Sequence, residues 1–304
     1  MSLLSLFAAL VIEQFRPLNY AHWVASPVRR WAAFVEGKVN AGEWQQGALA
    51  WGLTVGLGVV LVGIIHFVLL ATNTLAAWAW SILVLYLTMG FRQFSHHYTE
   101  IHLALREGDI ERARNLLAEW RGTRRELWTS SDVARLAIEQ ALVLSHRHVF
   151  AVIFWFVLLP GPCGAVLYRL ASLLDEHYSA RCDDAFCQFF RQTFAWIDWL
   201  PQRATAIAFA IVGDFEDAVY CWRTQAAQWG DRAAGIVLSA GAGAIGVRLG
   251  MPMTEEGEVT DRSEIGLNAD ADVDFMQSAV GLVWRASILW LLLLFMLSLA
   301  SLVG

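Results

Sequence analysis

An arginine in a glycine-rich turn is the feature of this sequence best suited to chemistry. Residues 242–252 read AGAIGVRLGMP, and they place Arg248 among Gly243, Gly246 and Gly250 between long hydrophobic blocks. A glycine-rich loop lets backbone N–H groups approach an anion, and a guanidinium adds positive charge at the same place. We therefore expect Gly246 and Arg248 to bind the anionic part of a ligand. The alternative is that the glycines serve tight helix packing.

A second candidate is the pair Asp198 and Arg203, which lies within the otherwise apolar residues 196–212. A charged side chain at the centre of a membrane helix costs on the order of 2.5–3.5 kcal/mol and therefore needs a partner or water. Two interpretations stay open. Either Arg203 faces an internal polar cavity, or both residues lie at the membrane interface beside Trp196 and Trp199.

Three more side chains are candidates for ligand binding, namely His97, Glu139 and Asp175. His97 follows His96 and precedes Glu100, which could suggest a metal cluster. Adjacent residues of a helix point about 100° apart, however, so a solvated helix face is the alternative. Glu139 and Asp175 adjoin apolar helices, where helix-terminal solvation competes with ligand binding. We expect no metal site from these residues.

The hydrophobic blocks around these candidates indicate a membrane protein. Of the 304 residues, 57% are hydrophobic and only 16% are charged, which is unusual for a soluble protein. Residues 47–70 carry no charge and as a helix would measure about 36 Å, enough to cross the roughly 30 Å hydrocarbon core. A second segment at 76–90 would form a hairpin with the first, and others are predicted at 2–12, 149–174, 196–212 and 287–304.

The predicted fold is all-α, a polytopic α-helical integral membrane protein with about five to six membrane segments and amphipathic cytoplasmic helices. Segment 2–12 is interpreted as a retained anchor because it lacks the charged start and the cleavage site of a signal peptide. Pro160 and Pro162 are expected to break segment 149–174 near its middle. Asp109 is the predicted N-cap of a cytoplasmic helix that ends at Gly122.

The distribution of arginines predicts the orientation. Residues 91–148 contain nine arginines, and residues 16–46 add further positive charge on the same side of the hairpin. The positive-inside rule makes that side cytoplasmic, so we expect a multi-pass protein of the bacterial inner membrane whose main loops are cytoplasmic. We predict a single domain over 1–304, with a cytoplasmic helical insertion at 91–148 and an acidic cytoplasmic loop at 251–278.

Composition also limits the partners. The lipid bilayer is one, a homo-oligomer is left open, and the sequence has no basic stripe that would support nucleic-acid binding. The four cysteines show no Cys-x-x-Cys pair and no zinc spacing, so we expect free thiols without a role at Cys163, Cys182, Cys187 and Cys221.

Several motifs are similar to those of the CobD/CbiB family of membrane proteins. The turn at 242–252 resembles the family signature AGALGVRLGGP, and residues 261–266, DRSEIG, resemble its Glu-Arg-Pro-x-Ile-Gly. Glu139 lies where the family has the first acid of a pattern similar to ESxxENxxD. His97 matches a histidine of the family's amphipathic cytoplasmic helix, and residues 172–175 are similar to its Asn-Thr-Leu-Asp. The resemblance adds Arg262 to the candidate ligand-binding residues.

The resemblance implies an adenosylcobinamide-phosphate synthase of cobalamin biosynthesis, which joins an aminopropanol phosphate to the carboxyl groups of a corrinoid. It also implies a requirement for ATP and Mg²⁺, with oxygen ligands for the metal and arginines for phosphate. Several family positions have changed. The second acid, the asparagine and the aspartate of the family pattern are here Val143, Leu144 and Arg147, and its paired aspartates are Phe194 and Ala195. Fewer oxygen ligands should weaken bound Mg²⁺ severely.

These changes favour another interpretation. Residues 197–203, IDWLPQR, are similar to the Leu-Asp-Trp-Val-Pro-Val-Arg of AmpE proteins, a branch of the same superfamily with a sensory or signalling role. Our leading hypothesis is an AmpE-like binding or signalling protein without catalysis or a cofactor. Its cytoplasmic polar pocket would take a phosphorylated or corrinoid-like molecule and would contain His97, Glu139, Asp175, Arg203 and Arg248. The alternative is the synthase, or a related ATP- and Mg-dependent amide-forming enzyme.

Overall fold

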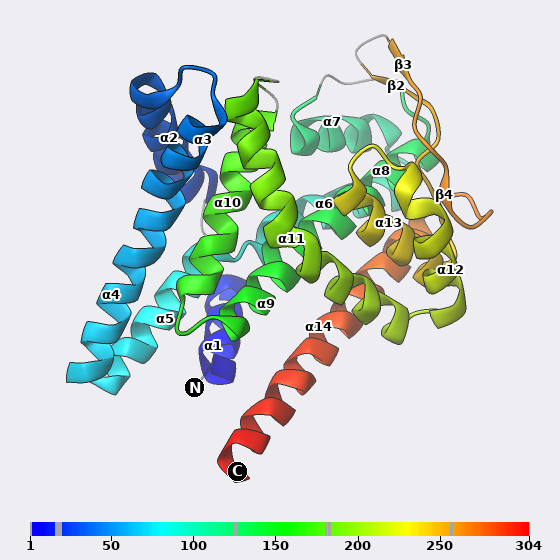
Figure 1. Cartoon of the computed structure of the whole chain (residues 1–304). Helices are drawn as coiled ribbons and strands as arrows, with labels where there is room; N and C mark the ends of the chain where they lie inside the picture. Colours follow the sequence, from blue (N-terminus) through cyan, green and yellow to red (C-terminus); the bar gives the residue numbers. More distant parts are fainter. Residues whose placement is uncertain are drawn as a thin grey trace. The chain divides into compact units, whose positions relative to one another are not determined.

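The chain folds into two compact units, each assembled from two separate stretches of sequence. The computed structural model describes residues 2–15, 20–123, 127–179, 181, 184–255 and 258–303. Unit 1 contains Met1–Arg92 and Arg147–Pro201, and unit 2 contains Gln93–His146 and Gln202–Gly304. Helices dominate both units, which confirms the predicted all-α fold (Figure 1).

Unit 1 is a set of helices that pack through buried apolar side chains. In chain order they are α1 (Ser2–Phe15), η1 (Ala21–Ala25), α2 (Ser26–Val39), α3 (Trp44–Trp51), η2 (Gly52–Gly56), α4 (Leu57–Thr72), α5 (Thr74–Thr88), η3 (His146–Phe150), α9 (Ala151–Leu158), α10 (Cys163–Ser179) and the first part of α11 (Ala185–Val212). Aromatic side chains fill the core, where the ring centroids of Tyr178 and Phe190 lie 4.3 Å apart. This packing fixes α10 against the start of α11.

A helical hairpin forms where the sequence predicted one. The helical stretch Trp44–Thr72 is 29 residues long, and α5 packs back against its α4 portion (Figure 1). The reversal takes place at Asn73, whose side-chain oxygen accepts hydrogen bonds from the backbone N–H groups of Leu75 (2.9 Å) and Ala76 (3.3 Å). The short polar side chain thus satisfies two donors at the start of α5 that have no partner within the helix.

The predicted break at the prolines is also confirmed. Helix α9 ends at Leu158 and α10 begins at Cys163, with Gly161 between them at a φ of 61°. Proline lacks a backbone N–H and fixes its φ, so a continuous helix cannot pass through Pro160 and Pro162. Helix α10 packs against α9, and the chain therefore turns back at this point.

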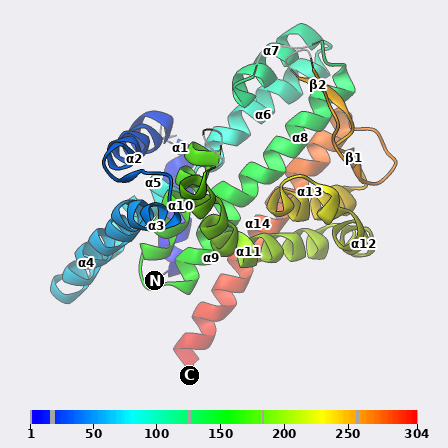
Figure 2. The same ribbon diagram turned by 45° about the horizontal axis from the view of Figure 1, so that its top comes forward.

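Unit 2 combines helices with four short strands. Its helices are α6 (Phe91–Arg106), α7 (Ile110–Arg121), α8 (Ser130–Ser145), the last part of α11, α12 (Phe215–Gln225), η4 (Ala226–Gln228), α13 (Arg232–Ile245) and α14 (Val273–Val303). Helix α12 packs along α13, and α14 packs against α8 and α13 (Figure 2). Asp109 caps α7 and Gly122 ends it in the left-handed conformation, as predicted.

The strands lie between α13 and α14 in the sequence and form two small antiparallel sheets. Strand β1 (Arg248–Leu249) pairs with β4 (Ile265–Gly266), so that Arg248 lies opposite Gly266 and Leu249 opposite Ile265. Strand β2 (Met253–Glu255) pairs with β3 (Glu258–Thr260). These strands, of two or three residues each, were not predicted, and they shape the loop that follows the glycine-rich turn.

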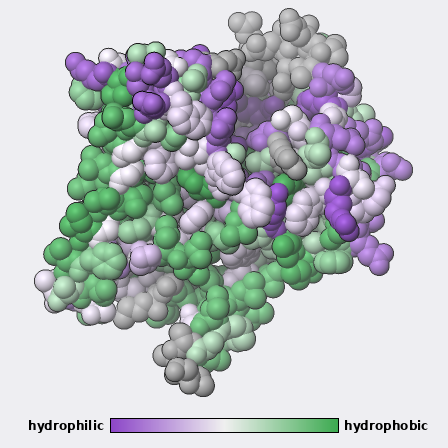
Figure 3. All heavy atoms as spheres, in the orientation of Figure 1, coloured by the Kyte–Doolittle hydropathy of each residue, from purple (hydrophilic) through white to green (hydrophobic). Residues whose placement is uncertain are grey.

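Among the described residues, three helical stretches are long and apolar enough to cross a membrane, namely Trp44–Thr72, Ser130–Leu158 and Val273–Ala300. Only 17% of the most apolar window is buried in the first stretch and 22% in the third, so most of their hydrophobic surface faces outward. Figure 3 shows this surface over α4 and α14. In Ser130–Leu158 the buried share is 61%, so core packing explains much of its apolar character. The number of crossings stays a prediction.

One prediction about the cysteines is wrong. Cys163 and Cys221 are free and buried, as expected, but Cys187 is disulfide-bonded. Cys187 lies in the first turn of α11, and it belongs to neither of the cysteine spacings for which the sequence was searched. Cys182, Arg16, Arg124 and residues 256–257 of the acidic loop lie outside the described residues.

Candidate functional site

The glycine-rich turn begins where α13 ends. Gly246 has a φ of 76°, in the left-handed region, and its N–H bonds to the carbonyl oxygens of Ala242 and Gly243. The Val247 N–H also donates to the Ala242 oxygen, at 3.0 Å. These bonds close the helix in the usual glycine-terminated manner and direct the chain into β1. Gly246 therefore sets the direction from which Arg248 leaves the helix.

Close packing explains two other glycines of the turn. A methyl group added to Gly243 would lie 2.4 Å from the Asp217 carbonyl oxygen, so Gly243 lets α13 approach α12. At Gly250 the φ is 78°, and an added methyl group would lie 2.0 Å from the Ser263 oxygen. The packing role left open by the sequence is thus observed at both positions.

Glu139 is the anion that this turn holds. The side chain lies on α8 and is 4% exposed, and its Oε1 accepts a hydrogen bond of 2.8 Å from the Gly250 N–H. Its Oε2 accepts a hydrogen bond from the Arg262 guanidinium, which lies 4.8 Å from the centre of the Trp229 ring. A buried carboxylate is tolerated when it is paired and hydrogen-bonded in this way. We name the contact among Glu139, Gly250 and Arg262 the turn clamp.

Arg248 lies near the surface and contacts two acids. Its guanidinium bonds to Glu264 at 3.4 Å and to Asp270. The Arg248 side chain is 25% exposed, while those of Glu264 and Asp270 are 54% and 68% exposed. The hydrogen bond that Arg248 donates to Asp270 raises the pKa of Arg248, so its charge is permanent. Because the two acids are solvated, an incoming anion can compete with them for this guanidinium at modest cost.

Two residues near the turn were missed by sequence reasoning. Arg135, which is 5% exposed, bonds to Asp132 at 2.6 Å and contacts the Met251 sulfur at 3.1 Å. The spacing of three between Asp132 and Arg135 on one helix is a signal that could have identified this pair. Gln225 donates to the Gly266 carbonyl oxygen at 3.1 Å and accepts from the Gly266 N–H at 2.6 Å. We find no sequence signal for the second pair.

The other predicted site residues lie elsewhere in the two units. His97, on α6, stacks on Trp120 with ring centroids 6.2 Å apart. Its neighbour His96 pairs with Glu100 at 3.7 Å on an exposed face, which fits the solvated-face alternative. Arg203 lies half-buried on α11 in unit 2. Asp175 belongs to unit 1 and accepts a hydrogen bond from Ser179, so the predicted five-residue pocket stays a prediction.

Asp198, in unit 1, is an internal residue. It is 1% exposed and accepts a hydrogen bond of 2.9 Å from the hydroxyl of Tyr168, which is fully buried. Trp196 and Trp199 are 80% and 52% exposed, as expected for aromatic residues that anchor a membrane interface. The aspartate therefore points inward while the two tryptophans point outward, and the two interpretations of Arg203 stay predictions.

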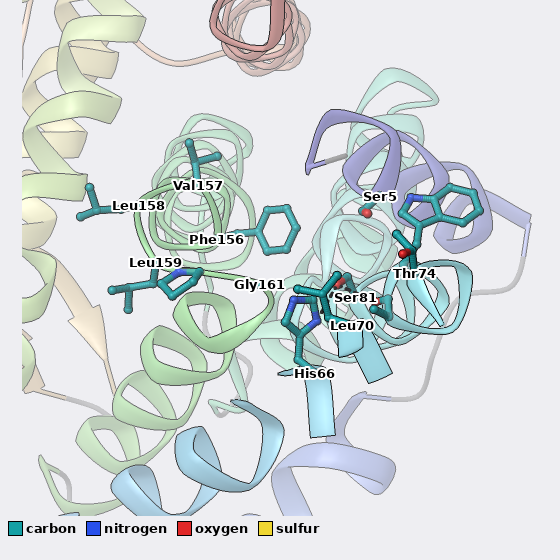
Figure 4. A pocket seen from close by; sticks show the side chains of 13 residues that line it. Ser5, His66, Leu70, Thr74, Ser81, Phe156, Val157, Leu158, Leu159 and Gly161 are labelled. Atoms are coloured by element: carbon teal, nitrogen blue, oxygen red, sulfur yellow. Dashed lines mark hydrogen bonds between the residues drawn. The ribbon is translucent and has the colours of Figure 1, made fainter. Parts of the chain in front are cut away.

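Unit 1 also contains a cavity of about 460 Å³ among its apolar helices (Figure 4). Residues of α1, α4, α5 and α9 and of the proline turn line it. His66 and Ser81 face each other there, with their polar atoms 3.5 Å apart, and Phe156 and Leu159 contribute apolar surface.

The described residues do not form a metal cage. No group of three or more histidine, cysteine, aspartate or glutamate side chains lies close enough to hold a metal ion within the described ranges. Glu264 and Asp270 both contact Arg248, so a guanidinium occupies the place where a cation would neutralise them. The residues seen here therefore do not fit a preformed Mg²⁺ site.

Comparisons with known proteins identify the family. A family described as CobD/Cbib protein matches residues 4–283. The chain belongs to the CobD/CbiB family. Cobalamin biosynthesis protein CobD of Stutzerimonas stutzeri is 36% identical over 221 residues, which cover 71% of this chain and 72% of the relative. CobD of Chromobacterium violaceum is 37% identical over 237 residues, covering 73% and 75%.

More distant members of the CobD/CbiB family extend the match. Cobalamin biosynthesis protein CbiB of Salmonella typhimurium is 27% identical over 271 residues, which cover 82% of this chain and 80% of the relative. No solved structure matches the chain. These CobD and CbiB relatives are named for cobalamin biosynthesis, so an AmpE-like branch and a signalling role find no support in them. The family and the apolar helices together make the chain an integral membrane protein.

Proposed function

We propose that this chain acts in cobalamin biosynthesis as a membrane-bound, ATP-dependent amide-forming synthase. Its substrates would be a phosphorylated amino alcohol and a corrinoid carboxylate. The family match over residues 4–283 and the names of the CobD relatives support the pathway. The synthase was the alternative hypothesis from the sequence, and it fits the comparisons better than the binding or signalling role.

One structural observation carries the proposal, namely that three family-like segments meet in unit 2. The carboxylate of Glu139 is bonded to Gly250 of the glycine-rich turn and to Arg262 of the DRSEIG segment. These residues are 111 and 123 positions apart from Glu139. Segments so distant in sequence form a common contact that a simple membrane anchor would not need, and we interpret it as the frame of the substrate site.

Each arginine has a distinct place in the proposed reaction. Arg248 is solvated and paired with exposed acids, so it is suited to exchange them for a substrate phosphate. Arg262 is 15% exposed and held by Glu139 and Trp229, so it is suited to keep the loop in position. Joining an amine to a carboxylate requires activation of the carboxylate, which ATP would supply. We assign no step to Mg²⁺.

The proposal includes a location. We place the chain in the bacterial inner membrane with the turn clamp on the cytoplasmic side, where ATP is available. The basis is the nine arginines between residues 91 and 148 and the positive-inside rule. A reporter fused after Val303 should then show which side of the membrane the end of α14 reaches.

Turnover tests the proposed function directly. The purified full chain in detergent would be incubated with ATP, Mg²⁺, a corrinoid acid and aminopropanol phosphate, and the amide product measured by mass spectrometry. We expect product from the wild type and at least about tenfold less from Arg248→Gln, since a charged hydrogen bond contributes about 1.5–3 kcal/mol. Arg285→Gln, on the exposed face of α14, is the matched control and should retain turnover.

Other outcomes would contradict the synthase. A folded wild-type chain that makes no product, yet binds the corrinoid acid, would return the assignment to a binding role. Product formation that is unaffected by Arg248→Gln would remove the turn from the active site. Turnover without added ATP would overturn the ATP-dependent reaction class.

A further inference from the structure

A buried arginine in unit 1 has no acidic partner among the residues that the structure describes. Arg169, on α10, is 2% exposed. Its Nη2 lies 3.2 Å from Nδ1 and 3.3 Å from Nε2 of His148, and its guanidinium carbon lies 4.1 Å above the Tyr20 ring. Within the described part of the chain, no carboxylate lies at ion-pair distance from it. An uncompensated buried guanidinium is costly, so this site favours an anion.

The nearest acids have other partners. Glu176 lies 3.7 Å from the Arg147 guanidinium, and Asp198 accepts a hydrogen bond from Tyr168. Arg147 and Arg169 both lie close enough to His148 to interact with it electrostatically. Both arginines therefore lie beside His148, and Glu176 pairs with Arg147 and not with Arg169.

Two further atoms of the site can donate hydrogen bonds. Arg169 Nε is buried without a partner among the described residues, and so is the hydroxyl of Ser172, one helical turn later and 1% exposed. Residues three apart on a helix lie on the same face. Nearer the surface, the side chains of Arg147 and Glu176 are 18% and 33% exposed. Donors at the base and partly exposed charges above them describe an oxyanion site.

We propose that Arg169 and Ser172, with His148 and Arg147 at the entrance, bind the phosphate group of a phosphorylated ligand. A guanidinium bonds phosphate through two parallel N–H groups, and a hydroxyl can reach a third oxygen. The inference deepens the proposed function, on which it rests for the identity of the phosphate ester. Arg169 and Ser172 belong to unit 1, whereas Arg248 belongs to unit 2.

Phosphate binding to the full chain in detergent tests the inference. Inorganic phosphate would be titrated at constant ionic strength and followed by ³¹P NMR. We expect Arg169→Gln to weaken binding at least about tenfold and Ser172→Ala roughly 2- to 10-fold. Arg30→Gln changes an exposed arginine of the same unit and should leave binding unchanged. Equal affinity of Arg169→Gln and the wild type would overturn the site.

Acetate distinguishes the ligand class. Displacement of phosphate by an equal concentration of acetate would overturn the assignment to phosphate, whereas failure of acetate to compete supports it. Turnover separates this proposal from the synthase. If the wild type forms product but Arg169→Gln does not change its affinity for phosphate, the phosphate site is refuted and the synthase is not. Phosphate binding that depends on Arg169, without any turnover, would keep the site and remove the synthase.

A measurement on the wild type covers the case in which Arg169→Gln does not fold. Phenylglyoxal modifies accessible guanidinium groups, and mass spectrometry of the peptide that contains Arg169 reports the rate. We expect phosphate to slow this modification at least about tenfold while acetate has little effect. Modification at the same rate with and without phosphate would refute the proposal. So would complete resistance to phenylglyoxal, because a small solute would then be unable to reach the site.

Discussion

The turn clamp predicts a large and specific loss of stability when its charge is removed. Glu139→Gln keeps the size of the side chain and an oxygen that can accept from the Gly250 N–H, so it mainly removes the ion pair with Arg262. Loss of one partner of a buried pair costs about 3–5 kcal/mol. Arg262 is 15% exposed and keeps its contact with Trp229, so we expect about 2–3 kcal/mol here.

The assay is equilibrium unfolding of the full chain in mixed micelles with increasing denaturing detergent. A double-mutant cycle with Glu139→Gln and Arg262→Gln would isolate the pair, and we expect a coupling free energy of about 2 kcal/mol. The matched control is Glu264→Gln, whose side chain is 54% exposed and pairs with Arg248 at the surface. Its effect should be much smaller, because exposed ion pairs contribute little.

Two results would refute this reasoning. A coupling below about 0.5 kcal/mol would mean that Glu139 and Arg262 do not act together in the folded protein. An effect of Glu264→Gln as large as that of Glu139→Gln would mean that burial does not decide the strength of these pairs. Either result would also weaken the proposal that the clamp frames a substrate site.

Three other predictions follow from individual residues. In a thermal unfolding assay, Gly250→Ala should destabilise the protein by more than about 2 kcal/mol, because the φ of Gly250 is 78° and an added methyl group would meet the Ser263 oxygen. Gly37→Ala is the control. It has open space around it and should be neutral or stabilising. Asn73→Ala should cost about 1 kcal/mol through the loss of the α5 cap, and no change in the unfolding midpoint would contradict this. Burial, and then the charge of Asp217, raises the pKa of the Cys221 thiol. At pH 8 its thiolate fraction and its rate of alkylation should therefore be lower than those of an unperturbed cysteine, and both should increase as the pH rises. Alkylation at the rate of an unperturbed cysteine would contradict this prediction.

Local features of the fold could be predicted from the sequence. Asn73 marks a hairpin because the residues on both sides are apolar, and Pro160 marks a break because proline cannot continue a helix. The cap at Asp109 and the glycine end at Gly122 follow from the same short-range rules. Each of these features depends on residues within about one helical turn of one another.

Features that depend on distant residues could not be predicted. The sequence places Glu139 beside an apolar helix, but nothing in it indicates that Arg262, 123 positions later, supplies the counter-charge. The stretch Ser130–Leu158 was read as a cytoplasmic helix followed by a membrane segment, whereas much of its apolar surface packs inside the protein. Burial against protein and burial in lipid select the same side chains, so composition does not separate them.

The candidate site follows the same division. Gly246 and Arg248 belong to a recognisable turn, and the structure shows where that turn leads the chain. Arg169 was not among the predicted site residues because a single arginine in an apolar segment gives no pattern. Only the surrounding side chains show that no described acid pairs with it. The strands of two or three residues are too short for the alternation by which strands are recognised.

The paired hydrogen bonds between Gln225 and Gly266 also bear on how the molecule avoids unwanted association. A two-stranded ladder leaves an outer row of backbone groups that another chain can extend. On β4 the side-chain amide of Gln225 occupies both the N–H and the carbonyl of Gly266, as a neighbouring strand would. One glutamine on a helix thus closes an edge that would otherwise be open to a foreign strand.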